Sequence, residues 1–114
     1  MPEKPNLHRL AESRSLALHR ELVARLRAQP SLLQKASARV AEWLKTGAVH
    51  PEYARAWARL LSGPAEELFA VLVDPGEQAR ALRQCTPFAG IVEPRERWRI
   101  WRQARKAFDE ESAP

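Results

Sequence analysis

The sequence predicts an all-α protein, a compact bundle of five to six helices. Within each segment, apolar residues recur every three or four positions, as they do along one face of a helix. No segment shows the alternating pattern of a half-buried strand. Prolines separate the segments, and they stand at Pro30, Pro51, Pro64, Pro75, Pro87 and Pro94. The length of 114 residues predicts one domain, residues 1–114, with flexible ends at 1–5 and 109–114.

The first predicted helix covers residues 7–28. Leu18, Leu22 and Leu26 recur every four residues and define its apolar face. Leu10 and Leu16 lie off this stripe. They form either a second stripe for a dimer or partner contact, or the seam of a helix packed between two neighbours of its own bundle.

The next two predicted helices have clear boundaries. The second begins after Pro30, with Ser31 as the expected N-cap, and ends before Gly47. The third begins at Pro51 and ends at Gly63, and we expect the preceding residue, His50, either to cap it or to lie in solvent.

The second half of the chain predicts three further helices. The fourth begins at Pro64, and the fifth covers residues 75–84 with Asp74 as its expected N-cap. Residues 85–92 contain a proline and a glycine, so we predict an ordered loop there, held by apolar side chains. The last predicted helix covers residues 94–108.

Charge and composition exclude several classes of protein. The net charge of +5 divides into +5 over residues 1–46, −2 over 47–93 and +2 over 94–114. A single cysteine excludes an internal disulfide and favours a reducing compartment, so we expect a cytoplasmic protein. Four glycines are too few for the common phosphate-binding loops. The sequence contains no apolar run long enough for a membrane span, and none follows the N-terminal charges as in a signal peptide.

Neither metal nor nucleophilic chemistry has a convincing motif. His8 and His19 lie about three helical turns apart, roughly 16 Å, so they do not share a metal ion. Cys85 has no neighbouring histidine, and its apolar surroundings favour a buried, inert thiol. We therefore predict no catalytic residue, no metal and no cofactor.

One pattern points to an alternative as an enzyme. Arg14 and His19, with four residues between them, resemble the short motif of the HEPN ribonucleases, which are small helical bundles. In that family, an arginine and a histidine at a dimer interface act on an RNA phosphodiester. On one helix these two side chains point about 140° apart, so only a dimer or a helix end brings them together.

The last predicted helix carries six basic residues between positions 95 and 106, interleaved with Trp98 and Trp101. Arginine binds phosphate and tryptophan stacks on bases, so this helix is a candidate for nucleic-acid binding. The alternative is a surface helix with both tryptophans in the core. The spacing of Trp101, Ala104 and Phe108 favours that alternative, and the acidic residues 109–111 weaken a phosphate site.

Several segments resemble a pattern found in short all-helical bacterial proteins of antitoxin type. They are LRQCTPFAG at 82–90, RWRI at 97–100, VHPEYARAW at 49–57 and SRSLALH at 13–19. The resemblance implies a partner in a two-gene module whose toxin is often a nucleotidyltransferase-like enzyme, and it implies no catalytic residue. A DNA-binding domain, which many antitoxins have, is not evident here.

These observations predict a non-enzymatic interaction protein of antitoxin or regulatory type. It would act sterically, by covering a partner protein with basic and apolar helix faces. A nucleic-acid-binding protein that uses the same arginines is the second interpretation, and the HEPN-like ribonuclease is the third. The predicted contact residues are Arg14, His19, Arg20, Arg95, Arg99 and Arg102.

Overall fold

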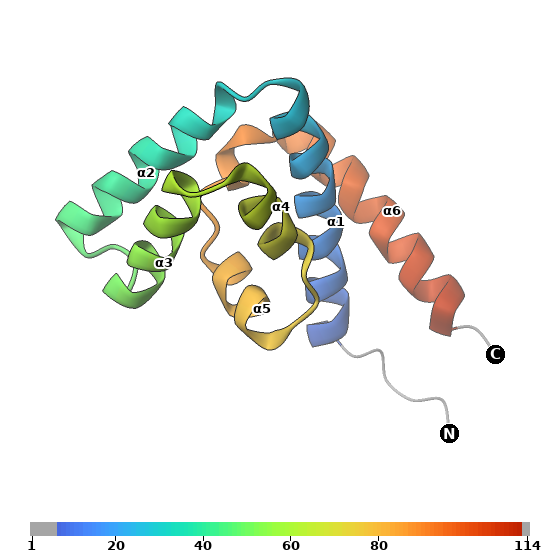
Figure 1. Ribbon diagram of the computed structural model, residues 1–114. Helices are drawn as coiled ribbons and strands as arrows, with labels where there is room; N and C mark the ends of the chain where they lie inside the picture. Colours follow the sequence, from blue (N-terminus) through green and yellow to red (C-terminus); the bar gives the residue numbers. More distant parts are fainter. Residues whose placement is uncertain (1–6, 113–114) are drawn as a thin grey trace.

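The computed structural model describes residues 7–112 and confirms the all-α prediction. Across these residues the chain forms six α-helices and one short 3-10 turn, with no strand (Figure 1). The helices are α1 (Leu7–Ala28), α2 (Leu32–Thr46), α3 (Pro51–Ser62), α4 (Ala65–Val73), α5 (Glu77–Gln84) and α6 (Pro94–Ser112). The 3-10 turn, Ala89–Ile91, lies between α5 and α6. The predicted flexible segment 1–5 lies outside the described residues.

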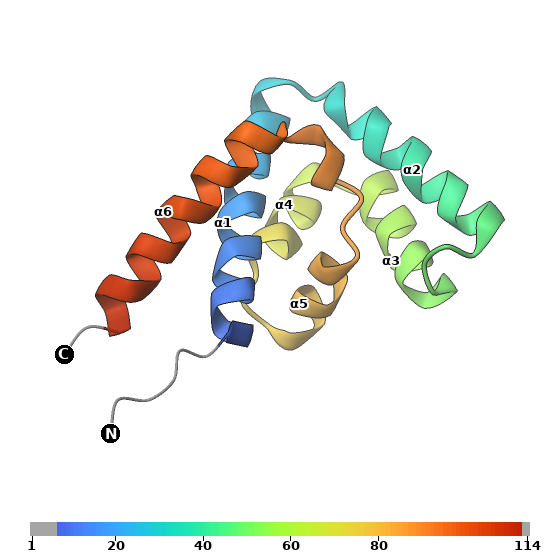
Figure 2. The same cartoon turned by 180° about the vertical axis from the view of Figure 1, so that it is seen from behind.

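Helix α1 is the central element of the fold. It packs against α6 on one side and against α4 and α5 on the other (Figure 2). Helices α1 and α6 run antiparallel, since Arg25 near the end of α1 pairs with Glu96 at the start of α6. Leu16 lines the α1–α6 seam beside Ala104 and Phe108. Leu16 is therefore half-buried against the chain's own last helix, while Leu10, the other leucine off the main stripe of α1, is buried.

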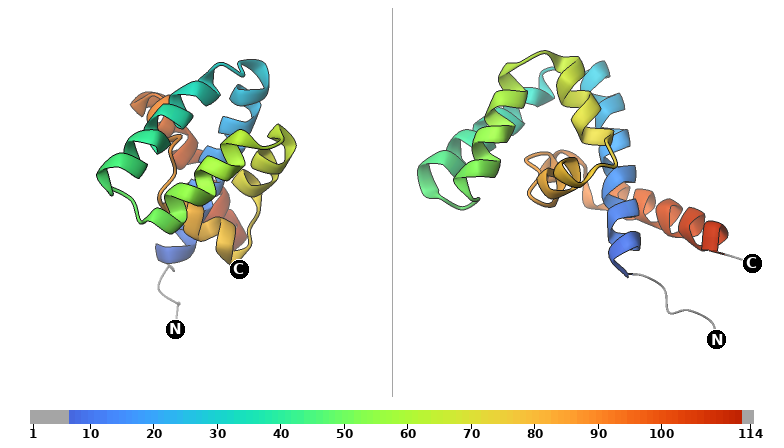
Figure 3. Two further views of the ribbon diagram at one scale, coloured as in Figure 1. Left: turned by 60° about the vertical axis from the view of Figure 1, so that its left-hand side comes forward. Right: turned by 60° about the horizontal axis from the view of Figure 1, so that its bottom comes forward.

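The remaining helices form the other half of the molecule. Helices α2 and α3 pack together as a hairpin, and α4 lies between this hairpin and α1 (Figure 3). The core gathers where these elements meet, and Trp57 of α3 packs edge-on against Phe88 of the 85–92 segment, with ring centroids 5.9 Å apart. Its other buried members include Leu18, Leu22, Leu26, Ala36, Val40, Leu68, Leu72 and Val92.

Two predicted N-caps are wrong. Ser31 already has helical dihedral angles and its hydroxyl makes no capping bond, whereas an N-cap residue normally has extended dihedral angles. Asp74 closes α4 and its carboxylate accepts a bond of 2.7 Å from the Gly76 N–H. This local turn delays the start of α5 to Glu77. The expected cap at His50 is confirmed, because its Nδ1 accepts a bond of 3.1 Å from the Glu52 N–H.

The last third of the chain differs from the prediction at one boundary. The ordered loop at 85–92 is confirmed, with Phe88 fully buried in the core. Helix α6 continues to Ser112, four residues beyond the predicted end. Arg105 pairs with Asp109 one turn later at 3.1 Å, a spacing that supports helix in the acidic end. Among residues 7–112, no helix has both the length and the apolar character that a membrane crossing requires.

Gly47 provides a test of the boundary between α2 and α3. It is the one described residue with a positive φ, 72°, and its N–H closes α2 on the Trp43 carbonyl. A Cβ atom there would meet nothing within 4 Å, so a side chain costs only backbone strain. We expect Gly47→Ala to lower the free energy of unfolding by about 1 kcal/mol in urea titrations. Gly47→Asn should lower the free energy of unfolding by less, because asparagine tolerates a positive φ. Equal losses in the two variants would contradict the left-handed conformation at residue 47.

Candidate functional site

Helix α6 carries a row of cations on the face turned away from α1. Arg95, Arg99, Arg102 and Lys106 follow one another at intervals of four, three and four residues, so they share one side of the helix over about 16 Å. All four are exposed. Within the part of the chain that the structure describes, none of them forms a hydrogen bond or an ion pair. We call these four residues the α6 cation row.

Many of the other arginines have carboxylate partners. Arg25 pairs with Glu21 and Glu96, and Arg27 bonds both oxygens of Glu66 at 2.7 and 3.0 Å. The α6 cation row concentrates four unpaired charges within twelve residues. Helix α2 has three exposed cations without a carboxylate partner, Lys35, Arg39 and Lys45, and α3 has two, Arg55 and Arg59. The row is therefore the densest run of uncompensated positive charge on a single described helix.

Trp98 lies beside this row and not in the core. Its side chain is 61% exposed, whereas Trp101 is half-buried against α1. The interpretation that places both tryptophans in the core is thus wrong for Trp98. The reason is its angular position, about 60° away from the Trp101–Ala104–Phe108 stripe. The two rings border a shallow groove of about 590 Å³, whose further lining is Arg14, Arg102, Arg105, Lys106, Asp109 and Glu110.

His19 is buried and is not part of the α6 cation row, although its ring lines the small cleft between α1, the 85–92 segment and α6. It is 1% exposed, and both ring nitrogens are bonded, Nδ1 to the Ser15 carbonyl at 2.7 Å and Nε2 to the Thr86 hydroxyl at 2.9 Å. A carbonyl only accepts, so Nδ1 carries the proton and Nε2 accepts from Thr86. The Thr86 oxygen in turn accepts from the Phe88 N–H at 3.2 Å. His19 therefore attaches the 85–92 segment to α1, and its prediction as a contact residue is corrected.

The electrostatics of His19 agree with a structural role. Burial lowers its pKa from 6.5 to about 4, the bond to Ser15 opposes the shift, and the nearby charge of Arg83 adds to it. The ring is thus neutral near pH 7 and is screened from solvent. Arg14, the other half of the ribonuclease-like motif, lies with its guanidinium carbon 6.0 Å from the centre of the Trp101 ring. Both residues line the small cleft between α1, the 85–92 segment and α6, but both nitrogens of the buried His19 ring are already bonded within the protein.

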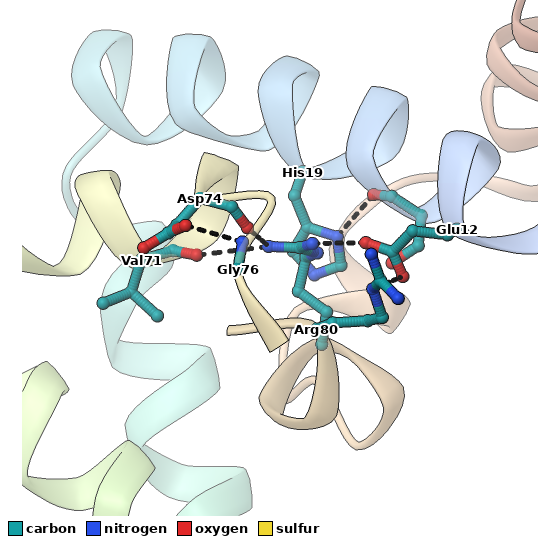
Figure 4. Close-up of polar contacts among 8 residues, drawn as sticks. Glu12, His19, Val71, Asp74, Gly76 and Arg80 are labelled. Carbon is teal, nitrogen blue, oxygen red and sulfur yellow. Dashed lines mark hydrogen bonds and ion pairs between the residues drawn. The ribbon is translucent and has the colours of Figure 1, made fainter. Parts of the chain in front are cut away.

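A buried ionic cluster lies next to His19 (Figure 4). The side chain of Arg83 in α5 is fully buried and pairs with Glu12 of α1. Its Nη1 donates to the carbonyls of Asp74 at 2.6 Å and Val71 at 3.3 Å, which lie at the C-terminal end of α4. Arg80 adds a second, exposed contact to Glu12 at 3.7 Å. One guanidinium therefore joins three helices.

The predicted contact residues fall into separate places. Arg95, Arg99 and Arg102 belong to the α6 cation row, and Arg14 lies beside Trp101 at its edge. Arg20 lies in a different groove on the α1–α6 seam, which Gln103 and Glu111 also line. The structure thus places three of the six predicted residues in one row, and Arg14 shares the groove at Trp98 with one of them, Arg102.

Sequence reasoning missed Glu12, Arg83 and Thr86 as organising residues. The only signal for Arg83 was its place four residues after Ala79 on the buried face of α5. Cys85 was better anticipated, since burial raises the pKa of its thiol and favours the unreactive form. No group of three histidine, cysteine, aspartate or glutamate side chains in residues 7–112 is placed to hold a metal ion.

The buried His19 predicts a loss of stability in acid. The unfolded chain binds a proton near pH 6.5 while the folded ring stays neutral to about pH 4, so stability is complete above 6.5 and falls as the pH is lowered toward 4. Between pH 6.5 and 5 the loss is about 2 kcal/mol. Urea titrations of His19→Gln should show a flatter pH dependence than the parent. Ser31→Ala, a change at an exposed, non-titrating residue whose hydroxyl makes no capping bond, should retain the parent's slope.

The Arg83 cluster predicts an unequal response to carboxylate removal. Glu12→Ala leaves a buried guanidinium without its counter-charge and should lower the free energy of unfolding by about 3 kcal/mol. Glu12→Gln keeps a hydrogen-bond acceptor for Arg83 and should lower the free energy of unfolding by less than Glu12→Ala does. Glu66→Ala, which removes an exposed pair, should leave the urea midpoint almost unchanged. A Glu12→Ala midpoint as high as that of Glu66→Ala would contradict the role of the cluster.

No protein-family model, curated protein or solved structure matches this chain. The case for its function therefore rests on the geometry of its own residues. Two features stand out, the exposed α6 cation row beside Trp98 and the buried cluster that positions α1 against α4 and α5. The first is accessible to a partner, and the second holds the scaffold.

Proposed function

We propose that the protein is a non-enzymatic binding protein whose α6 docks into an acidic groove on a partner protein. The observation that carries the proposal is the α6 cation row, four exposed cations without partners beside a 61% exposed tryptophan. Arginine and tryptophan are the residues most enriched among those that contribute strongly to protein interfaces. A helix that packs on one side only leaves its outer face free for such a contact.

Charge placement supports a protein partner over a nucleic acid. Exposed carboxylates flank the row, with Glu93 before it and Asp109, Glu110 and Glu111 after it. A polyphosphate strand that continued past either end of the row would meet like charge, which disfavours binding. A partner groove of limited length matches a row of about 16 Å, and it also accommodates Trp98.

The mechanism that follows is steric. Binding through α6 would cover a surface of the partner without any chemical step by this chain. The resemblance to antitoxin-type proteins leads us to propose that the partner is encoded by the neighbouring gene and that this protein regulates it. Acidic surfaces that bind metal–nucleotide complexes are the kind of surface that such a helix would cover.

The test compares two charge-reversed proteins. Arg99→Glu with Arg102→Glu reverses two charges of the row, and Arg55→Glu with Arg59→Glu makes the same change on α3. Calorimetric titration against the protein encoded by the adjacent gene should show at least about a tenfold loss of affinity for the α6 variant only. The affinity of the unmodified pair should fall as salt is raised.

Two results would overturn this proposal. Equal affinity of both variants for the partner would remove α6 from the interface. A labelled single-stranded RNA that binds the parent with a steep salt dependence, and loses binding in the α6 variant alone, would reassign the row to nucleic acid.

A further inference from the structure

A second, smaller cleft lies between α1, the 85–92 segment and α6. It has a volume of about 340 Å³ and adjoins the groove at Trp98 through Arg14 and Trp101, which line both. Arg14, Arg83 and Arg97 contribute to its wall together with Trp101 and Thr86. Among its described lining residues none is acidic, although the chain has 14 aspartates and glutamates. The cleft is therefore electropositive.

All three of its guanidinium groups have a buried Nε without a partner, and two of them, those of Arg14 and Arg97, also lack a carboxylate. Arg14 forms no hydrogen bond with any described residue, and its Nε is buried without a partner. Arg97 uses only Nη2, which donates to the carbonyls of Ala89 at 2.7 Å and Val92 at 3.3 Å, and its Nε is likewise buried without a partner. Buried N–H groups are nearly always bonded in native proteins, so these donors mark a place for an acceptor.

Trp101 holds both guanidinium groups in place. The guanidinium carbons of Arg14 and Arg97 lie 6.0 and 5.8 Å from the centre of its ring. A cation–π contact of this kind favours an arginine beside the ring without consuming its hydrogen-bond donors. The third arginine, Arg83, is neutralised by Glu12 and bonded to the end of α4. The uncompensated charge of the cleft thus comes from Arg14 and Arg97.

We propose that this cleft binds a small oxyanion, a phosphate or carboxylate group, between the guanidinium groups of Arg14 and Arg97, with Trp101 as its wall. Planar guanidinium groups match such anions with two parallel charge-assisted bonds each. The group belongs either to a free small molecule or to a peptide carboxylate. The proposal does not rest on docking by α6, because the cleft lies on the side of α6 that faces α1 and the loop.

The test is an NMR titration of the whole protein that follows the Trp101 indole N–H. Inorganic phosphate and acetate are added in separate titrations, with sodium chloride at matched ionic strength as the reference. We expect a saturable shift with at least one of the two oxyanions and no saturation with chloride. Saturation by phosphate alone identifies a phosphate ligand, and saturation by acetate alone identifies a carboxylate ligand.

Variants distinguish the cleft from the rest of the basic surface. Arg14→Gln should weaken oxyanion binding by about tenfold, because it removes one of the two guanidinium groups that bind the anion. Arg14 makes no hydrogen bond within the described chain, so this change should not disturb the fold. Arg14→Lys keeps the charge but loses the planar guanidinium group, so its affinity for the oxyanion should lie between that of the parent and that of Arg14→Gln. Arg99→Gln in the α6 cation row should bind like the parent. Arg97 also holds the 89–92 turn, so Arg14 is the variant that carries the test.

The outcomes that overturn the proposal are specific. The cleft is not an oxyanion site if neither anion produces a saturable shift, or if Arg14→Gln binds as tightly as the parent. An equal loss in Arg99→Gln would assign the effect to the general basic field. The Arg99→Glu, Arg102→Glu protein should still bind the oxyanion, so failure of the α6 docking proposal and failure of this one are separately visible.

Discussion

The buried guanidinium of Arg83 is the constraint on which the arrangement of this protein depends. It pairs with Glu12 of α1 and donates to the carbonyls of Val71 and Asp74 at the C-terminal end of α4, where intrahelical hydrogen bonding runs out. A buried charge without these partners would cost several kcal/mol, so α1, α4 and α5 are stable together only in the arrangement that supplies them. The 85–92 segment follows α5 directly, and its position is therefore set by the same contact.

The neutral His19 strengthens this constraint at the start of the 85–92 segment. Its bond to Thr86 holds that segment against α1, and the following turn is bonded by Arg97 of α6. The scaffold thus continues from α4 through α5 and the loop to the start of α6, with α1 as the common partner. Helix α6 packs mainly against α1, so its outer face, which carries the α6 cation row, is left exposed.

Much of the architecture was predictable because it depends on local rules. Apolar spacing located every helix, Gly47 and Gly63 marked two ends, and the proline and glycine of residues 85–92 indicated a loop. The failures also have local causes. The Asp74 carboxylate bonds the Gly76 N–H, but Gly76 itself has extended dihedral angles, so α5 begins only at Glu77. The alternative that placed Trp98 in the core together with Trp101 is wrong for Trp98, because its angle on α6 places it in solvent.

The sequence by itself determined the helices, their boundaries to within a few residues, and the basic character of the last helix, because each of these depends on neighbours within about one helical turn. Only the tertiary structure decided which arginines are paired and which are free. Glu12 and Arg83 are 71 positions apart, and His19 and Thr86 are 67 apart, so the spacing of residues along a helix cannot predict these contacts. The same packing buried His19, exposed Trp98 and placed Arg14 beside Arg97 and Trp101, because burial depends on which helices meet and not on the order of residues along any one of them.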